Sequence, residues 1–133
     1  MNQFKSTITD IETIGNLNLV TFDFDGNTLQ MVSLELPSGL GCRDNVVLMV
    51  KPTSVGLAQY FNDEANSFNK LQVTIIDIEQ GKILTSLRLQ IGTTIFESVI
   101  TTNSFNQMDL KRGQNIIALI NPTHLFIHKV CND

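Results

Sequence analysis

The sequence predicts an all-β chain that contains two consecutive copies of one small barrel. The first observation is an internal repeat, because Lys5–Glu12 reads Lys-Ser-Thr-Ile-Thr-Asp-Ile-Glu and Gln72–Glu79 reads Gln-Val-Thr-Ile-Ile-Asp-Ile-Glu. The two segments align at an offset of 67 residues, which also places Asn2 on Asn69. The second observation is an alternation of apolar and polar residues, rich in β-branched types, that is typical of strands. A repeated β domain follows from the two observations together.

The first half is expected to contain five strands. Asp25-Gly26-Asn27 supplies the chemistry of a hairpin turn between the second and the third. The run Val46–Val50 is short and fully apolar, which is typical of a buried strand, and Lys51-Pro52 interrupts it. The expected strands are Asn2–Glu12, Asn16–Phe24, Thr28–Leu36, Val46–Val50 and Val55–Tyr60.

The second half repeats this order of elements. Between its third and fourth strands, Ser104–Leu110 can form about two helical turns with Ser104 as N-cap, and Gly113 ends that piece. Five short strands with a brief helix between strands 3 and 4 is the count of an OB-like barrel, and it occurs twice. We expect domains at residues 1–60 and 69–133, joined by a polar linker at 61–68. The expected strands are Lys70–Glu79, Ile83–Gln90, Thr94–Thr102, Gln114–Ile120 and His124–Val130.

Bulk properties exclude several classes of protein. With 133 residues, 42% of them hydrophobic, the chain has a globular composition, and no apolar run is long enough to span a membrane. Each repeat, at roughly 65 residues, is small for a core of its own, so the halves are expected to share a core or to oligomerise. The start of the chain lacks the features of a secretory signal, and Cys42 and Cys131 form no paired metal spacing. We therefore expect a cytoplasmic protein with reduced thiols.

The charge of the chain argues against nucleic acid as a direct partner. The formal net charge is −4, and the sequence has no cluster of Lys and Arg that would neutralise a phosphate backbone. An anion site in such a chain needs local hydrogen-bond donors, because the overall field repels anions.

The segment Val99–Ile120 resembles the core of a molybdenum-pterin-binding (Mop, or TOBE) domain. In that family the segment reads approximately as Ile-Thr, a short helix, Gly-Leu-Lys-x-Gly, and an apolar strand that ends in Ile-Lys. The first half matches the family through Asn2–Lys5 and Val46–Val55. Together the copies cover nearly the whole chain, which is similar to a di-Mop molbindin or to the effector half of a molybdate-responsive repressor without its DNA-binding domain.

The resemblance implies a protein that binds molybdate or tungstate, for storage, homeostasis or sensing, and performs no chemistry on it. Both ligands are tetrahedral dianions, and hydroxyls, backbone N–H groups and Lys or Arg are suited to hold their oxygens. Because family members hold the anion between domains or subunits, the resemblance also implies a homo-oligomer, with a trimer favoured over a dimer. No catalytic cofactor is implied.

The resemblance implies a set of anion-binding positions. Lys51 falls on the family's lysine at the end of the fourth strand, and Thr101 falls on its threonine at the end of the third. The family's Ser-Ala-Arg-Asn motif corresponds to residues 66–69, so Phe68 stands at the arginine. The implied oxyanion-binding residues are Lys51, Thr53, Ser54, Ser67, Asn69, Thr101, Asn121 and Thr123.

Departures from the family pattern leave a second function open. Besides Phe68 at the arginine position, Asn121 replaces the second lysine, and Pro52 and Pro122 each remove a backbone N–H. A chain with these changes is also consistent with a regulatory or protein-interaction module that keeps the fold and has lost the usual oxyanion site.

The segment Val20–Leu29 is similar to the Asp-x-Asp-Gly-Thr motif of haloacid-dehalogenase phosphatases. Asn27 is inserted into that motif, no later Gly-Asp-x-x-x-Asp pair would hold magnesium, and no alternating βα pattern surrounds it. The equivalent stretch of the second copy, Leu87–Gly92, lacks both acids. We therefore interpret Asp23 and Asp25 as exposed strand residues and expect no enzymatic activity.

His124, His128 and Cys131 near the C-terminus are potential metal ligands by residue type. Their spacing matches no zinc motif. We expect them to be solvent-facing strand residues, and we predict no metal site.

Overall fold

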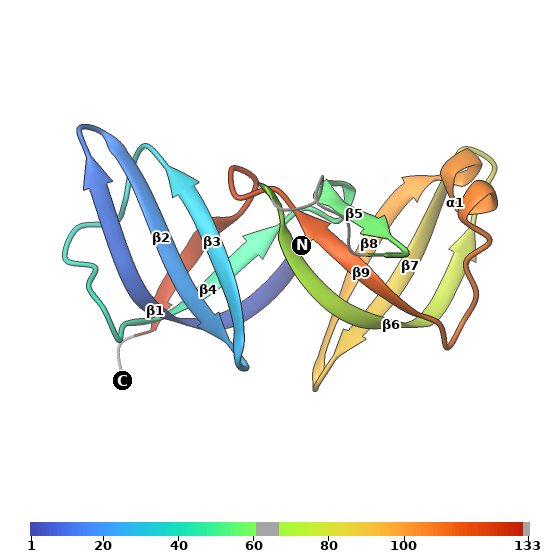
Figure 1. The fold of residues 1–133 in the computed structure, drawn as a ribbon, viewed down its shortest axis with the longest axis horizontal. Helices are drawn as coiled ribbons and strands as arrows, with labels where there is room; N and C mark the ends of the chain where they lie inside the picture. Colours follow the sequence, from blue (N-terminus) through green and yellow to red (C-terminus); the bar gives the residue numbers. More distant parts are fainter. Residues whose placement is uncertain (61–66, 132–133) are drawn as a thin grey trace.

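The structure of the chain, a computed structural model, describes residues 1–60 and 67–131. The described part contains two five-stranded antiparallel sheets, placed side by side in Figure 1. The all-β prediction is confirmed, and the predicted strand positions agree closely with the structure. The elements are β1 (Asn2–Ile14), β2 (Leu17–Phe24), β3 (Asn27–Ser33), β4 (Asn45–Val50), the 3-10 helix η1 (Pro52–Ser54), β5 (Val55–Ala58), β6 (Asn69–Gln80), β7 (Leu84–Ile91), β8 (Thr94–Thr101), α1 (Thr102–Met108), β9 (Asn115–Ile120) and β10 (Phe126–Cys131).

The repeat in the sequence is also a repeat in the structure. The first strand of each half, β1 or β6, shifts its pairing register just after Ile8 or Ile75, at equivalent positions. In each half the carbonyl of that isoleucine accepts a 2.7 Å hydrogen bond from the turn before the fourth strand, donated by the N–H of Arg43 or Gly113. Both turn residues have a left-handed backbone, with φ of 76° and 88°, which favours glycine over arginine.

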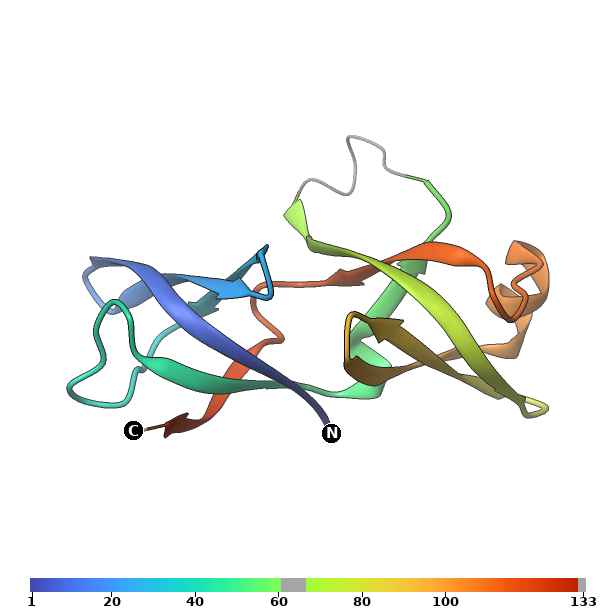
Figure 2. The same ribbon diagram turned by 90° about the horizontal axis from the view of Figure 1, so that it is seen from below.

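Each sheet takes its edge strand from the other half of the chain. The strand orders are β10-β4-β1-β2-β3 and β5-β9-β6-β7-β8. Thus β5, from the first half, pairs with β9, while β10, from the end of the chain, pairs with β4, and Figure 2 shows both crossings. The expected domain limits follow the repeat along the sequence, whereas each sheet combines strands of both halves. Residues 61–66 of the expected linker lie outside the described residues.

The two halves share one hydrophobic core. Phe4, which is 0% exposed, packs edge-to-face on Phe24 of its own half, with the ring centroids 5.1 Å apart. It makes the same kind of contact with Phe96 of the other half, at 5.0 Å. Alternating residues of β1, β2, β6 and β7 point into this core, so the predicted period of two is the pattern that buries it.

Two buried asparagines join the halves at equivalent positions. The Asn69 side chain accepts a hydrogen bond from the Gln30 N–H at 2.8 Å and donates one to the Gln30 carbonyl at 2.9 Å. Asn2 makes the same pair of bonds with Glu97, at 2.9 and 2.7 Å. Each amide therefore provides hydrogen-bond partners for one backbone N–H and one carbonyl on the third strand of the opposite half. In a sheet, a neighbouring strand would provide these partners.

We expect Asn69→Ala to lower the free energy of unfolding by about 2–4 kcal/mol, because the exchange leaves the Gln30 N–H and carbonyl without their partner. Urea denaturation measures the loss. Asn103→Ala, at an exposed position of α1, is the matched control and is expected to change stability by less than about 0.5 kcal/mol. Equal stability of the two variants would contradict a joining role for Asn69.

The helix of the second half begins earlier than predicted. Thr101 is its N-cap, since the Thr101 Oγ1 accepts a 3.1 Å hydrogen bond from the N–H of Ser104, which lies inside the helix. The helix ends at Asp109, whose left-handed backbone, with φ of 51°, breaks it four residues before Gly113. The general prediction of a short helix between the third and fourth strands is correct for this half.

The same prediction is wrong for the first half. Residues 34–44, between β3 and β4, form turns and contain no helix. This segment is two residues shorter than its counterpart, and it contains Pro37, Gly39 and Gly41, which disfavour a helix interior.

The residues of the alternative motifs do not form a reactive cluster. Asp23 is exposed on β2, and Asp25 lies in the following turn, with a φ of 48°, rather than on the strand face. His128 is exposed on β10, and Cys42 and Cys131 are free thiols. Within residues 1–60 and 67–131, no three His, Cys, Asp or Glu side chains gather closely enough to hold a metal ion.

No helix within the described ranges has the length and apolar character needed to cross a membrane.

Candidate binding site at the junction of the two halves

A cavity of about 620 Å³ lies where the two halves meet. The first half contributes η1 and β5 to its wall, and the second half contributes Phe68, the ends of β7 and β8, and the segment that follows β9. Apolar residues such as Leu84 and Leu119 form much of the wall. Its polar side chains are Thr53, Ser54, Thr101, Ser104, Asn121 and His124. Four of the eight predicted oxyanion-binding residues therefore line a single cavity.

Short-range bonds fix Thr53 and Ser54 on the wall. Pro52 starts η1, and the Ser54 N–H donates to the Lys51 carbonyl at 2.9 Å. The buried Ser98 hydroxyl of β8 donates to the Val55 carbonyl at 2.6 Å, which fastens this turn to the opposite half. These bonds fix the backbone of the turn that carries Thr53 and Ser54.

Asn121 is oriented by its neighbour Thr123. The Asn121 Oδ1 accepts from the Thr123 N–H at 3.0 Å and from the Thr123 hydroxyl at 2.9 Å. This assigns the oxygen of the amide, and within the described residues nothing accepts from its NH2 group. Thr123 does not line the cavity, but it leaves Asn121 with two N–H donors for a ligand.

The hydroxyls of Thr101 and Ser104 are hydrogen-bonded to each other on the same wall. The Thr101 hydroxyl donates to the Ser104 Oγ at 2.9 Å while it caps the helix. The Ser104 hydroxyl accepts this bond, so its own proton is free to be donated.

Besides Thr123, three predicted site residues lie outside the cavity. Lys51 and Ser67 are exposed and do not line it, and the Asn69 amide is occupied by the Gln30 backbone. The cavity is also lined by two polar residues that the sequence did not predict as site residues, Ser104 and His124. Aligning the two halves at an offset of 70 in this region places His124 on Ser54, a signal that would have identified His124.

The cavity wall carries hydrogen-bond donors and no carboxylate. Of the described residues that line it, His124 is the one with a basic side chain. A clear pKa shift lies elsewhere: a 2.7 Å hydrogen bond from Arg112 holds the pKa of the exposed Asp77 below its usual value. Hydroxyl and amide donors without a competing carboxylate suit an anion with several acceptor oxygens.

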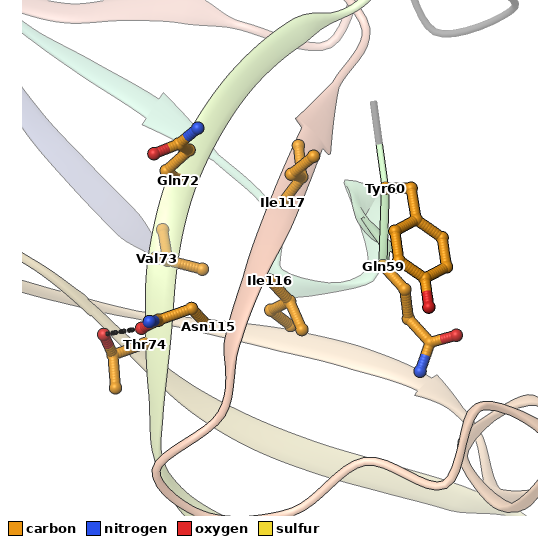
Figure 3. A pocket seen from close by; sticks show the side chains of 8 residues that line it. All are labelled: Gln59, Tyr60, Gln72, Val73, Thr74, Asn115, Ile116 and Ile117. Carbon is orange, nitrogen blue, oxygen red and sulfur yellow. Dashed lines mark hydrogen bonds between the residues drawn. The ribbon is translucent and has the colours of Figure 1, made fainter. Parts of the chain in front are cut away.

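A second hollow, of about 550 Å³, is lined by β6, β9 and the two residues that follow β5. Figure 3 shows the side chains that line it. It exists because β5 ends at Ala58 and leaves Ile116 and Asn115 without the fifth-strand pairing that β10 gives to β4. Gln59 and Tyr60 stand across the gap, and Asn115 is engaged with Thr74 at 2.8 Å. No predicted site residue and no charged side chain of the described chain lines this hollow.

Arg88 lines a smaller hollow of about 360 Å³ near Asn2. It is flanked by two carboxylates, since it stands opposite Asp77 on β6 and opposite Glu97 on β8. These charges oppose the binding of an anion there. The junction cavity is therefore the candidate site.

Comparison with known proteins identifies the class to which this architecture belongs. Residues 68–127 match the TOBE domain family. Over its whole length, the chain is similar to the crystal structure of the cytoplasmic molybdate-binding protein ModG with molybdate bound, with a TM-score of 0.86 and 25% sequence identity. That match covers 95% of this chain and 94% of the ModG chain. The resemblance to tandem Mop domains and the two OB-like units are thereby confirmed. No curated protein sequence matches the chain significantly.

Proposed function

We propose that this chain binds molybdate in the junction cavity and holds it without chemical change. The observation that carries the proposal is the convergence of Thr53 and Ser54 from one half with Thr101 and Asn121 from the other. The similarity to ModG, which is described as a cytoplasmic molybdate-binding protein, supports molybdate as the ligand and the cytoplasm as the cellular compartment. Tungstate, which has the same charge and tetrahedral shape, is expected to bind as well.

The donors match what a tetrahedral dianion requires. Its four oxygens can accept from the Thr53, Ser54 and Ser104 hydroxyls and from the NH2 group of Asn121. Hydrogen bonds to a charged acceptor are roughly twice as strong as those between neutral groups.

Calorimetric titration with molybdate, tungstate and sulfate tests the proposal directly. We expect heat of binding and a raised melting temperature with the first two anions, since a ligand that binds the native state stabilises it. Absence of both effects would refute molybdate binding.

Ser54→Ala is expected to weaken molybdate binding by about 10- to 100-fold, the worth of one hydrogen bond to a charged group. Within the described residues the Ser54 hydroxyl has no partner, so its removal takes away a ligand contact and no structural bond. Ser86→Ala on β7, outside the cavity, is the control and should bind as the wild type does. If both variants bind with unchanged affinity, Ser54 is not a ligand.

The proposed role is storage, homeostasis or sensing by a homo-oligomer, with a trimer expected ahead of a dimer. Sedimentation velocity gives the oligomeric state, and repeating it with molybdate shows whether the anion changes the assembly. A membrane or a nucleic acid is not an expected partner.

One observation favours a second candidate function. No Lys or Arg among the described residues lines the junction cavity, and Phe68, 36% exposed, occupies the position of the family's arginine. The second candidate is a regulatory or protein-interaction module with the same fold. It predicts no heat of binding with molybdate or tungstate, whereas a molybdate-binding protein is expected to give heat with both.

A further inference from the structure

Two equivalent positions of the repeat, one from each half, line the junction cavity and hold different residue types. Ser54 and His124 are equivalent in the two halves and follow the same kind of turn. In each, the backbone N–H donates to the carbonyl three residues earlier, Lys51 or Asn121, at 2.9 Å. One half therefore supplies a hydroxyl to the cavity and the other supplies an imidazole.

The imidazole of His124 is free to meet a ligand. Its side chain is exposed and makes no hydrogen bond or ion pair with the residues that the structure describes. Asn121, three residues earlier, also lines the cavity and keeps its NH2 donors available. A protonated imidazole beside these donors would add an N–H and a full positive charge to the wall.

Other charged groups on the surrounding elements do not line the cavity. They are Lys51 before η1, Lys70, Asp77 and Glu79 on β6, Lys82 in the β6–β7 turn, Arg88 on β7, Glu97 on β8, and His128 and Lys129 on β10. Protonation of His124 therefore changes the charge of the described wall from zero to +1.

We propose that His124 is the cation of the oxyanion site, so that affinity for the dianion depends on its protonation. This inference rests on the proposed function. The sign follows from linkage: the dianion binds more tightly to the protonated site, so binding takes up a proton, and affinity is gained as the pH falls and lost as it rises. The histidine takes the place of the arginine and lysine that Phe68 and Asn121 replace in the family pattern.

Titration of dilute, monomeric molybdate tests the proposal in the full chain. For the wild type we expect the Kd to rise about tenfold between about pH 6 and about pH 8, and calorimetry in two buffers of different protonation enthalpy should show uptake of part of a proton per anion. His124→Gln is expected to remove both the pH dependence and the proton uptake. His124→Lys should bind tightly at both pH values, because its charge persists.

His128→Gln is the matched control, since it removes a histidine of the same chain, on β10, that does not line the cavity. It should keep the pH dependence of the wild type. An equal pH dependence in His124→Gln and the wild type, or a flat profile in the wild type, overturns the role of His124 while leaving molybdate binding intact. No binding by any variant at any pH overturns the proposed function, and this inference with it.

Discussion

Neither half of this chain is expected to fold when it is expressed alone. Residues 1–60 contain β5, whose pairing partner β9 is in the other half, and they lack β10, which pairs with β4. Residues 61–133 contain β10 without its partner β4, and they lack β5, which pairs with β9. In this fragment Phe96 also loses its contact with Phe4. A repeat of roughly 65 residues has little core to spare, so the loss of an edge strand and of the shared core leaves it unfolded. Circular dichroism with urea denaturation measures this for each fragment.

Mixing the two fragments supplies the control. Because every strand pair is then available, we expect the mixture to recover a cooperative unfolding transition that neither fragment shows. A cooperative transition in residues 1–60 alone would mean that the first sheet is stable without β10, and would contradict the expectation.

Phe4→Ala is expected to destabilise the intact chain by about 3–5 kcal/mol, the usual cost of truncating a buried phenylalanine. The loss is at the upper end of such substitutions because the Phe4 ring contacts Phe24 and Phe96, one in each half. Urea denaturation at neutral pH measures it, and a small domain has only about 5–15 kcal/mol of stability in total.

Two further variants keep this prediction testable. Phe4→Leu retains most of the volume and should cost less than Phe4→Ala, so it reports on the site if the alanine variant does not fold. Tyr60→Ala removes an aromatic ring that is 77% exposed and should change stability by less than about 0.5 kcal/mol. A small effect of Phe4→Ala would contradict a core shared by the two halves.

The strands were predictable because their signals are local. Alternating burial along β1 and β6 repeats the alternation of residue types in the sequence, and the turn at Gly26 has the expected chemistry. The partner of an edge strand is not encoded locally, because β4 and β9 are both short apolar strands that either β5 or β10 could join. The exchange was therefore not predicted. The helix expected in the first half failed for a local reason, since Pro37 and a shorter segment outweighed the analogy between the copies.

Some residues of the candidate site could be predicted because they occur in a family motif. Others could not, because their place in the structure depends on contacts between distant parts of the chain. Thr53, Ser54 and Thr101 lie in the cavity as the family motif implies. Asn69 belongs to the family's Ser-Ala-Arg-Asn motif, yet its amide bonds to the backbone of Gln30, 39 residues earlier, a contact that no local pattern specifies. His124 enters the cavity only because β10 crosses to the first sheet, which brings the preceding turn alongside η1.

The exchanged strands also restrict how the two barrels can move relative to each other. Because β5 and β10 cross in opposite directions, a hinge motion that separated the barrels would have to pull both strands out of their sheets, at the cost of their backbone hydrogen bonds. Opening the junction is therefore close to unfolding. The two barrels therefore move as one unit, and the junction cavity keeps its shape as long as both exchanged strands stay paired.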